Sequence, residues 1–252
     1  MRMHDKVVLI TGGNTGIGKA VALAMGAEGA RVAVNYVAYE DQALELVDSL
    51  NSREPGAAMA CRADVTKADD VSRMFEAVRE RFGGVDVLIN NAGINIPASL
   101  LDLSEDDWDR VLDTNLKGPF LCSRAAIPMM LERGAGVIVN VSSESGLSTV
   151  SCPPTNAHYA AAKMGLIGLT RVMAVNFAPT IRVNAVAPGW IDTDIHHQLG
   201  EDGRVPMVLS QIPMGRAGTA DEVAEAIVFL SSAQSSYISG QTLAVGGARV
   251  LL

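Results

Sequence analysis

The chain has 252 residues, of which 48% are hydrophobic, and its formal net charge at pH 7 is −8. This length allows one large α/β domain, and the apolar content excludes disorder as the dominant state. The negative charge argues against nonspecific nucleic-acid binding, which depends on clustered positive charge. No apolar run approaches the ~18 residues of a membrane-spanning helix, and the first residues lack the apolar region of a secretory signal. We therefore expect a cytoplasmic protein without a nucleic-acid or membrane partner.

Strand-like and helix-like segments alternate along the first half of the chain. The continuous apolar run at 6–10 is typical of a strand that is buried on both faces. A glycine-rich turn follows it. The next expected elements are a helix at 16–28, a strand at 31–36, a helix at 39–50 with Leu44, Val47 and Leu50 on one face, a weak strand at 57–61, a helix at 67–82 and a strand at 85–89.

The alternation continues in the second half. Ser104, followed by acidic residues at 105–107, predicts the capped start of a helix. Strands separated by helices imply βαβ units, and so a single domain over 1–252 with a doubly wound parallel sheet flanked by helices. The remaining expected elements are a helix at about 120–133, a strand at 136–141, a helix at 157–178, a strand at 181–187, a helix at 220–230 and a strand at 241–245.

The first candidate site is the glycine-rich turn at 11–18, which ends the first strand and opens the first helix. Its glycines Gly12, Gly16 and Gly18 have the spacing G-x-x-x-G-x-G. Glycines here let the backbone turn tightly and let a pyrophosphate approach the helix N-terminus. A connecting turn would also tolerate glycine, but the strand–glycine–helix context favours a dinucleotide site.

The second candidate site is the pair Tyr159 and Lys163 in the long helix. Positions i and i+4 lie on one helix face, so the phenol and the ammonium can act together. An unperturbed tyrosine has a pKa near ~10, and a nearby cation lowers that pKa. Such a tyrosine can give a proton to a ketone or accept one from an alcohol.

Together these motifs resemble the short-chain dehydrogenase/reductase family over almost the whole chain. Further segments match in the family's order: Asp64-Val65, Asn-Asn-Ala-Gly at 90–93, Asn115, Ser142-Ser143 and Pro188-Gly189. The resemblance implies a Rossmann-type sheet of about seven strands in the order 3-2-1-4-5-6-7. It also implies an NAD(P)(H)-dependent oxidoreductase that interconverts a ketone and a secondary alcohol.

The resemblance further implies roles for individual residues. Tyr159 is the general acid/base, and Ser143 donates a hydrogen bond to the substrate oxygen. Lys163 binds the nicotinamide ribose and lowers the pKa of Tyr159, and Asn115 holds a water that links Lys163 to solvent. The implied cofactor-binding residues are Gly12, Asn14, Thr15, Gly16, Ile17, Gly18, Asn35, Tyr36, Asp64, Val65, Asn91, Ala92, Gly93, Tyr159, Lys163, Pro188, Gly189, Ile191 and Thr193.

The sequence departs from the family pattern beside the active site and at the C-terminus. Ser143 lies 16 positions before Tyr159, where many members have about three fewer. The stretch 148–156 resembles a small insertion, and Ser145 is a weaker candidate for the role of Ser143. The C-terminal segment 243–248 lacks the Asp-Gly-Gly of many relatives. The segment 190–216 is expected to be a mobile substrate lid.

The end of the second strand bears on the choice between NAD and NADP. An acidic residue there would hydrogen-bond the ribose hydroxyls and repel a 2′-phosphate. Residues 35–38 read Asn-Tyr-Val-Ala, and Thr15 is neutral where NADP-dependent relatives often carry arginine. Because the acid is missing, the sequence favours NADP(H) slightly over NAD(H).

Histidines and cysteines carry no expected site. His196 and His197 lack fixed ligand spacing, so no metal is expected. The three cysteines Cys61, Cys122 and Cys152 show no C-x-x-C spacing. An odd, scattered set fits buried thiols in a reducing compartment.

The substrate stays open between several ketones. Within the family, the chain resembles most the 3-oxoacyl-(acyl carrier) reductases and the glucose/polyol dehydrogenases. An acyl-carrier protein is acidic and needs a basic docking patch, but residues 177–180 are neutral, although Arg133 and Arg171 remain. A carrier-linked substrate, a sugar and a small free ketone all remain candidates.

A nonenzymatic dinucleotide-binding scaffold or sensor is the alternative from another class. That alternative predicts loss of Tyr159, Lys163 or Ser143, and all three are present. The resemblance also implies a homo-oligomer, usually a tetramer. Small residues in the long helix, Ala160 to Ala162, Gly165 and Gly168, allow close helix approach, although packing on the chain's own sheet explains them equally well.

Overall fold

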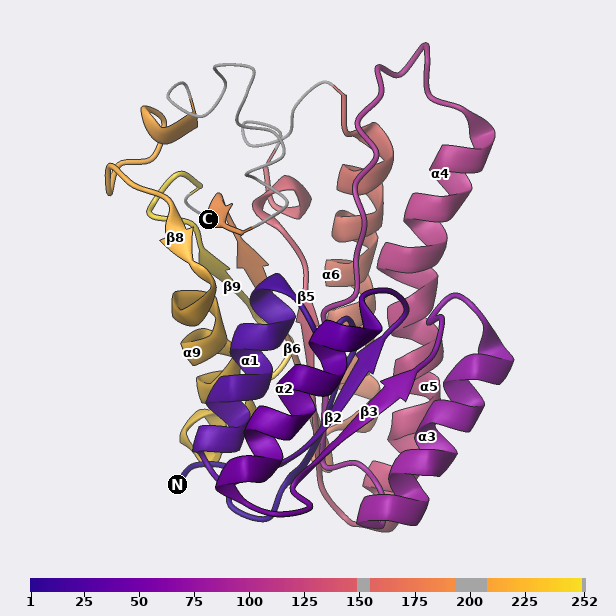
Figure 1. Cartoon of the computed structure of the whole chain (residues 1–252). Helices are drawn as coiled ribbons and strands as arrows, with labels where there is room; N and C mark the ends of the chain where they lie inside the picture. The colour runs from indigo at the N-terminus through magenta and orange to yellow at the C-terminus, as the bar shows by residue number, and fades with distance from the viewer. Residues whose placement is uncertain (149–154, 194–207, 251–252) are drawn as a thin grey trace.

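The parallel sheet at the centre of the chain has the predicted strand order. The computed structural model describes residues 1–148, 155–193 and 208–250. Within them, seven strands form one sheet in the order β3-β2-β1-β4-β5-β6-β9, and helices cover both faces (Figure 1). The doubly wound α/β fold is thereby confirmed. The seventh strand is β9 because β7 and β8 pair with each other in a separate small sheet.

All the predicted strands and helices are present, with ends displaced by at most three residues. The strands of the main sheet are β1 (Val7–Ile10), β2 (Arg31–Tyr36), β3 (Ala58–Arg62), β4 (Val87–Asn90), β5 (Gly136–Val141), β6 (Ile181–Pro188) and β9 (Thr242–Val245). The helices are α1 (Gly16–Ala27), α2 (Glu40–Arg53), α3 (Ala68–Phe82), α4 (Glu105–Leu112), α5 (Gly118–Glu132), α6 (Ala157–Phe177) and α9 (Ala220–Ser231).

The sequence analysis did not predict several short elements. Two to five residues are too few to show a hydrophobic period, so such elements carry no pattern. They are the strand pair β7 (Ile191–Asp192) and β8 (Gly218–Thr219), the π-helical turn η1 (Asp113–Lys117), and the 3₁₀ turns η2 (Glu144–Gly146) and η5 (Ala233–Ser235).

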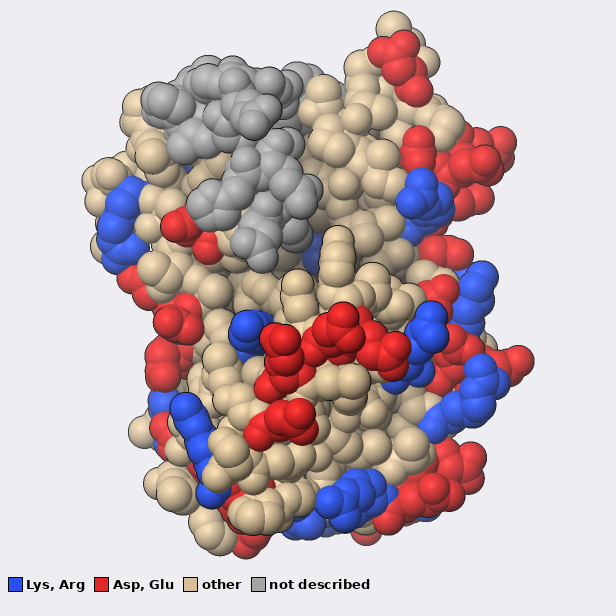
Figure 2. All heavy atoms as spheres, viewed as in Figure 1, with Lys and Arg blue, Asp and Glu red and all other residues tan. Residues whose placement is uncertain are grey.

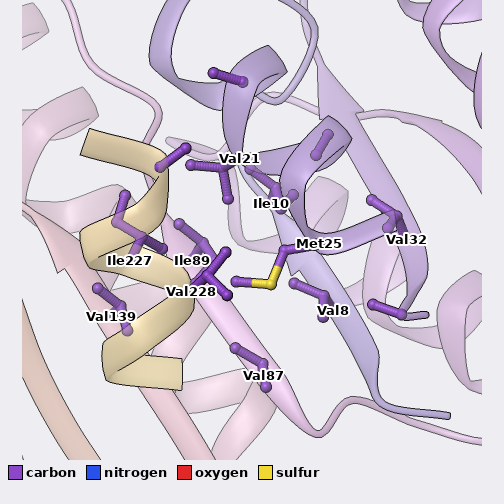
Figure 3. Packing of buried hydrophobic residues seen from close by; sticks show 14 of the residues in the cluster. Val8, Ile10, Val21, Met25, Val32, Val87, Ile89, Val139, Ile227 and Val228 are labelled. Atoms are coloured by element: carbon purple, nitrogen blue, oxygen red, sulfur yellow. The ribbon is translucent and has the colours of Figure 1, made fainter. Parts of the chain in front are cut away.

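Buried side chains form one apolar layer on each face of the sheet. On one face, Met25 of α1 and Ile227 of α9 pack over Val8 and Ile89 (Figure 3). On the other face, the layer comes from α3, α5 and α6 and includes Phe75. The two layers fix the sheet as a rigid platform.

The buried face of α2 differs from the expected one. Leu44 is 47% exposed. The buried residues are Ala43, Leu46, Val47 and Leu50, which have the i, i+3, i+4, i+7 spacing of a helix face. The prediction was wrong for Leu44, because the buried face begins one residue earlier, at Ala43.

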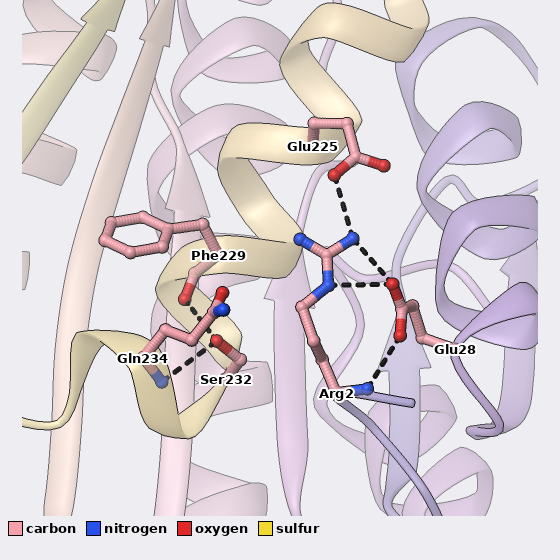
Figure 4. A network of polar contacts seen from close by, with 6 residues as sticks. All are labelled: Arg2, Glu28, Glu225, Phe229, Ser232 and Gln234. Atoms are coloured by element: carbon pink, nitrogen blue, oxygen red, sulfur yellow. Dashed lines mark hydrogen bonds and ion pairs between the residues drawn. The ribbon is translucent and has the colours of Figure 1, made fainter.

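The first residues of the chain are fastened at the amino ends of the strands. The Arg2 guanidinium donates to Glu28 Oε1 at 2.7 Å and to Glu225 Oε2 at 2.9 Å (Figure 4). This contact ties the N-terminus to the end of α1 and to α9. None of the helices in the described ranges has both the length and the apolar character needed to cross a membrane.

Candidate active site

The predicted site residues gather at the carboxyl ends of the central strands. The glycine-rich turn follows β1, Asn91 follows β4, Ser143 follows β5 and Gly189 follows β6. Because the strands are parallel, these positions meet at one edge of the sheet. In open α/β sheets this edge is where ligands bind.

The glycine-rich turn has a conformation that side chains would prevent. Gly12 and Gly16 have φ values of +57° and +50°, which favour glycine. A Cβ on Gly18 would overlap the carbonyl oxygen of Gly12 and lie 2.6 Å from Nδ2 of Asn91. That Nδ2 donates hydrogen bonds to the carbonyl oxygens of Thr11 and Gly12, at 3.0 and 2.9 Å. These hydrogen bonds fix the turn, and the missing side chain at Gly18 lets the backbone of Gly12 lie against the start of α1.

The start of α1 suits an anion. Thr15 caps the helix, but its side chain accepts no capping hydrogen bond within the described residues, and the first turn holds no acidic residue. The first N–H groups of α1 are thus free of a side-chain acceptor, and the helix dipole favours negative charge there. Ile17 packs against the core, and Asn14 Nδ2 donates to the carbonyl of Ala38 at 2.8 Å. The residues present therefore fit the pyrophosphate of a dinucleotide.

The side chain of Asn35 is hydrogen-bonded to the backbone around the glycine-rich turn. Its Oδ1 accepts from the Gly12 N–H at 3.2 Å, and its Nδ2 donates to the Ala63 carbonyl at 2.9 Å. The side chain therefore joins the glycine-rich turn to the end of β3. The Asp64 carboxylate accepts from the Thr66 N–H at 2.9 Å, and Val65 is buried beside it.

Two charged residues that the sequence analysis missed flank Tyr36. The Tyr36 hydroxyl donates to Glu40 Oε1 at 2.6 Å, and this hydrogen bond raises the pKa of Tyr36. Arg62 pairs in register with Tyr36 across β2 and β3 and is exposed. Acidic side chains also collect over α2 on this face of the molecule (Figure 2). No local pattern in the sequence marks these contacts, because Tyr36 ends β2, Glu40 begins α2 and Arg62 belongs to the neighbouring strand β3.

Tyr159 and Ser143 are brought together as the resemblance implies. Their side chains hydrogen-bond to each other, and burial raises the pKa of Tyr159 while this hydrogen bond lowers it. The Ser143 hydroxyl also accepts from the Ser145 N–H at 3.2 Å. Ser143 is thus bonded both to Tyr159 and to the backbone of Ser145. The phenol is neutral near pH 7 and can donate a proton.

Lys163 lies beneath Tyr159 but is hydrogen-bonded elsewhere. Its ammonium nitrogen donates to the Val141 carbonyl at 2.8 Å and lies 5.6 Å from the centroid of the Tyr159 ring. Burial lowers the pKa of Lys163 to about 8. The expected lowering of the Tyr159 pKa by Lys163 is not what this structure shows, because burial raises that pKa and the opposing effect comes from the hydrogen bond with Ser143.

Asn115 sits in the π-helical turn η1 and faces Lys163. Its Oδ1 accepts from the Ile94 N–H at 2.9 Å, and its Nδ2 donates to the Ile94 carbonyl at 2.7 Å. A Cβ on Gly93 would lie 2.8 Å from Asn115 Oδ1 and 3.5 Å from Lys163 Nζ. The absence of a side chain at Gly93 therefore leaves room beside both Asn115 Oδ1 and Lys163 Nζ. The adjacent Ala92 N–H donates to Thr11 Oγ1 at 3.0 Å.

The segment after β6 returns toward the glycine-rich turn. Pro188 ends the strand, and the Gly189 N–H donates to the Val245 carbonyl at 3.0 Å. Ile191 is buried in the core, and a Cβ on Gly16 would lie 3.8 Å from Thr193 Cγ2. The predicted cofactor residues of this segment thus border the pyrophosphate cradle. Residues 194–207 of the expected lid, with His196 and His197, lie outside the described residues.

Two of the three cysteines lie in the apolar core. Cys61 and Cys122 are free and buried, and burial raises their pKa values to about 11 and about 12. These thiols therefore stay protonated and unreactive at neutral pH. Cys152 lies outside the described residues. Across 1–148, 155–193 and 208–250, no group of three or more His, Cys, Asp or Glu side chains is placed to hold a metal.

Known proteins resemble this chain over nearly its full length. Residues 12–248 match the profile of a family described as Enoyl-(Acyl carrier protein) reductase. The chain is 42% identical over 255 residues to the 3-oxoacyl-(acyl-carrier-protein) reductase FabG of Thermotoga maritima, covering 100% of both chains. It is 41% identical over 244 residues to the protein of that name from Staphylococcus epidermidis, covering 96% of this chain and 98% of the relative. The Staphylococcus aureus protein is 41% identical over 243 residues, 96% of this chain and 97% of its own.

Proposed function

Because the chain belongs to the short-chain dehydrogenase/reductase family of NAD(P)-dependent oxidoreductases, we propose that it interconverts a ketone and a secondary alcohol by hydride transfer. The observation that carries this proposal is the hydrogen bond between Tyr159 and Ser143 above Lys163. This group lies at the same edge of the sheet as the dinucleotide cradle. A proton donor and a cofactor site at one edge are what ketone reduction needs.

The side chains have separate tasks in the proposed reaction. When bound in the cradle, a nicotinamide cofactor would supply the hydride for the carbonyl carbon, or accept it in the reverse direction. Tyr159 gives its hydroxyl proton to the carbonyl oxygen, or takes a proton from the alcohol. Ser143 donates a hydrogen bond that holds the same oxygen in place. Lys163, with its pKa near 8, returns a proton to Tyr159, and Asn115 keeps the space beside the ammonium open to a water.

The cofactor is held by the residues of the cradle. The N–H groups at 15–18 bind the pyrophosphate, Asp64 and Val65 border the adenine, and the segment from Pro188 to Thr193 borders the nicotinamide. The missing acid at 35–38 and the exposed Arg62 favour NADP(H) slightly over NAD(H), since a cation suits a 2′-phosphate. Glu40, bonded to Tyr36, opposes it.

The cofactor assignment is tested by titrating the purified protein with NADPH and with NADH and following nicotinamide fluorescence. We expect a smaller Kd for NADPH. Arg62→Gln should weaken NADPH binding and leave NADH binding unchanged, whereas Glu40→Gln should strengthen NADPH binding. An equal effect of Arg62→Gln on both cofactors would contradict its assigned contact. Binding of neither cofactor by the wild type would overturn both the enzyme and the dinucleotide-binding scaffold or sensor.

The substrate proposal follows the relatives, which are named as 3-oxoacyl-(acyl-carrier-protein) reductases. We propose a 3-oxoacyl reductase-like carbonyl reductase, with a glucose or polyol dehydrogenase as the second candidate. Of the two arginines considered for carrier docking, Arg133 forms an ion pair with Asp86 at 3.2 Å, whereas Arg171 is exposed. The pairing of Arg133 favours a free substrate over a carrier-bound one.

Turnover assays separate these candidates. A short 3-oxoacyl thioester is offered with the reduced cofactor, and glucose with the oxidised cofactor. We expect reduction of the thioester. Oxidation of glucose without reduction of the thioester would favour the glucose or polyol dehydrogenase over the 3-oxoacyl reductase. Cofactor binding without turnover on any ketone or alcohol would favour the nonenzymatic alternative.

The exposed face of α6 supports the proposed homo-tetramer. Met164, Val172 and Val175 are exposed on this helix, and Gly168 lies between them. A Cβ on Gly168 would have nothing within 4 Å, although glycine costs about 1 kcal/mol relative to alanine inside a helix. Close approach of a second copy explains this glycine. The cytoplasmic location expected from the sequence remains a prediction.

Light scattering tests the assembly. Gly168→Trp should reduce a tetramer to smaller species. Leu44→Trp, at an exposed position of α2, is the control and should leave the mass unchanged. A wild-type protein that is monomeric at assay concentrations would contradict the proposal.

A further inference from the structure

A buried carboxylate directly follows Ser143 and has no part in the site described above. The Glu144 side chain is only 3% exposed, and among the described residues neither of its oxygens accepts a hydrogen bond. A buried polar group without a hydrogen-bond partner costs about 1–3 kcal/mol, and more if it is charged. An apolar side chain of similar size would avoid this cost. Filling space is therefore not a sufficient reason for an acid here.

The carboxylate of Glu144 occupies the junction of two glycine segments. A Cβ on Gly246, directly after β9, would overlap Oε1 of Glu144. A Cβ on Gly189, directly after β6, would lie 2.7 Å from the same oxygen. The two segments are joined to each other, because the Gly189 N–H donates to the Val245 carbonyl. The absence of side chains at both positions makes room for this one carboxylate.

Arg249 is the charged group that faces Glu144. Its Nη1 lies 3.9 Å from Glu144 Oε2, and its Nη2 donates to Gln211 Oε1 at 2.8 Å. On the other side of Gly246 there is a hollow of about 510 Å³, lined in part by Trp190 and Met214. Arg249 therefore links the serine turn to Gln211 through polar contacts.

The backbone of Glu144 is coupled to the catalytic group. Glu144 is the first residue of the turn η2, which Ser143 caps by accepting from the Ser145 N–H. The same turn presses on α6, since a Cβ on Gly146 would lie 2.9 Å from the Lys163 carbonyl oxygen. A displacement of Glu144 would therefore move the Ser143 hydroxyl relative to Tyr159.

We propose that Glu144 is a positioning residue for the reaction and that Arg249 is its charge partner. The carboxylate fixes η2 against the segments at Gly189 and Gly246, and so holds the Ser143 hydroxyl against Tyr159. This inference rests on the proposed function, because it assumes the roles of Ser143 and Tyr159. Misplacement of a reacting group lowers kcat more than it weakens substrate binding.

Five variants test the pair: Glu144→Gln, Glu144→Met, Arg249→Gln, Arg249→Lys and the double variant Glu144→Gln with Arg249→Gln. Each is assayed for ketone reduction with its thermal stability measured alongside. The control is Glu28→Gln, which removes an ion pair with Arg2 at the far end of the sheet and should lower Tm without changing kcat.

We expect Glu144→Gln, Glu144→Met and Arg249→Gln each to lower kcat by about tenfold or more, with KM changed by less than about threefold. The double variant should be no slower than the slower single variant, because the two residues act as one unit. Arg249→Lys, which keeps the charge, should recover part of the loss. Arg249→Gln also tests the pair if the Glu144 variants fold poorly.

Two results would overturn this inference. If Glu144→Met keeps the wild-type kcat and gains thermal stability, the carboxylate has no positioning role. Additive losses in the double variant would show that the two residues act independently. Tyr159→Phe in the same assay separates the two proposals. If that variant stays active, the proposed function itself fails, whereas if it is inactive and the Glu144 variants match the wild type, only the positioning role fails.

Discussion

The ammonium nitrogen of Lys163 lies 5.6 Å from the centroid of the Tyr159 ring, one helical turn along α6. Burial raises the pKa of the tyrosine and lowers that of the lysine to about 8. Both shifts favour the neutral form of the side chain. The pKa values of the two groups therefore lie further apart than those of free tyrosine and lysine, so a protonated Lys163 readily returns a proton to an ionised Tyr159.

Removal of the Tyr159 hydroxyl should abolish turnover. In Tyr159→Phe we expect kcat to fall by about 10²–10⁴-fold, because the proton donor is lost, while the dinucleotide Kd stays the same. Turnover assays and fluorescence titration measure the two quantities. Tyr237→Phe, at a fully exposed tyrosine, is the matched control. Retained turnover across all accepted ketones in Tyr159→Phe would refute the assigned role.

Lys163 should make stability depend on alkaline pH. The folded protein releases the Lys163 proton above about pH 8, whereas the unfolded chain holds it to about 10.4. Between these values the unfolded state binds more protons, so the free energy of unfolding rises with pH. Relative to Lys163→Met, the wild type should gain on the order of 1–3 kcal/mol between about pH 7.5 and 10.

Urea denaturation at both pH values measures this gain. Lys19→Met, at an exposed lysine, is the matched control. If the free energies of unfolding of the wild type and of Lys163→Met differ by the same amount across this pH range, Lys163 is not buried as a free amine.

Gly18→Ala should disrupt the pyrophosphate cradle. The added methyl group would overlap the Gly12 carbonyl oxygen and approach Asn91 Nδ2, so the turn must open. We expect the dinucleotide Kd to rise by about tenfold or more, which corresponds to ~1.4 kcal/mol. Fluorescence titration gives the Kd. Gly93→Ala is the comparison variant, because its methyl group would crowd Asn115 and Lys163 and not the pyrophosphate cradle. An unchanged Kd in Gly18→Ala would mean that the cofactor binds elsewhere.

A buried chain of amides should contribute to stability from beneath the site. Asn140 Oδ1 accepts from Asn90 Nδ2 at 2.8 Å, and Asn140 Nδ2 donates to Thr170 Oγ1 at 2.8 Å. Asn140→Ala breaks both bonds at once, and we expect a loss of about 2–3 kcal/mol in the free energy of unfolding. Chemical denaturation measures it against Ser52→Ala, which removes one exposed hydrogen bond. Equal losses in the two variants would contradict the buried network.

The fold was predictable because its signals are local and repeated. The apolar run at Val7–Ile10 and the alternation of strands with helices predict the parallel sheet. The family resemblance adds the order of its strands. The glycine-rich turn and the pair Tyr159 and Lys163 were visible for the same reason, since each motif lies within eight residues.

Contacts between distant segments could not be predicted in this way. Arg62 reaches Tyr36 through the register of two parallel strands, and Glu144 meets Gly246 through a junction of segments about a hundred residues apart. The raised pKa of Tyr159 was also missed, because burial depends on the packed structure and not on the spacing of Tyr159 and Lys163.

The first and the last described residues of the chain lie at opposite ends of the strands. Met3 and Arg2 are bonded to Glu28 at the amino ends of the strands, whereas Arg249 faces Glu144 beside the serine turn. An affinity tag placed after the last residue would therefore crowd the reacting end of the molecule, and one placed before Met1 would not. Kinetic constants measured with a C-terminal tag should differ from those of the N-terminally tagged protein, and cleavage of the C-terminal tag should restore them.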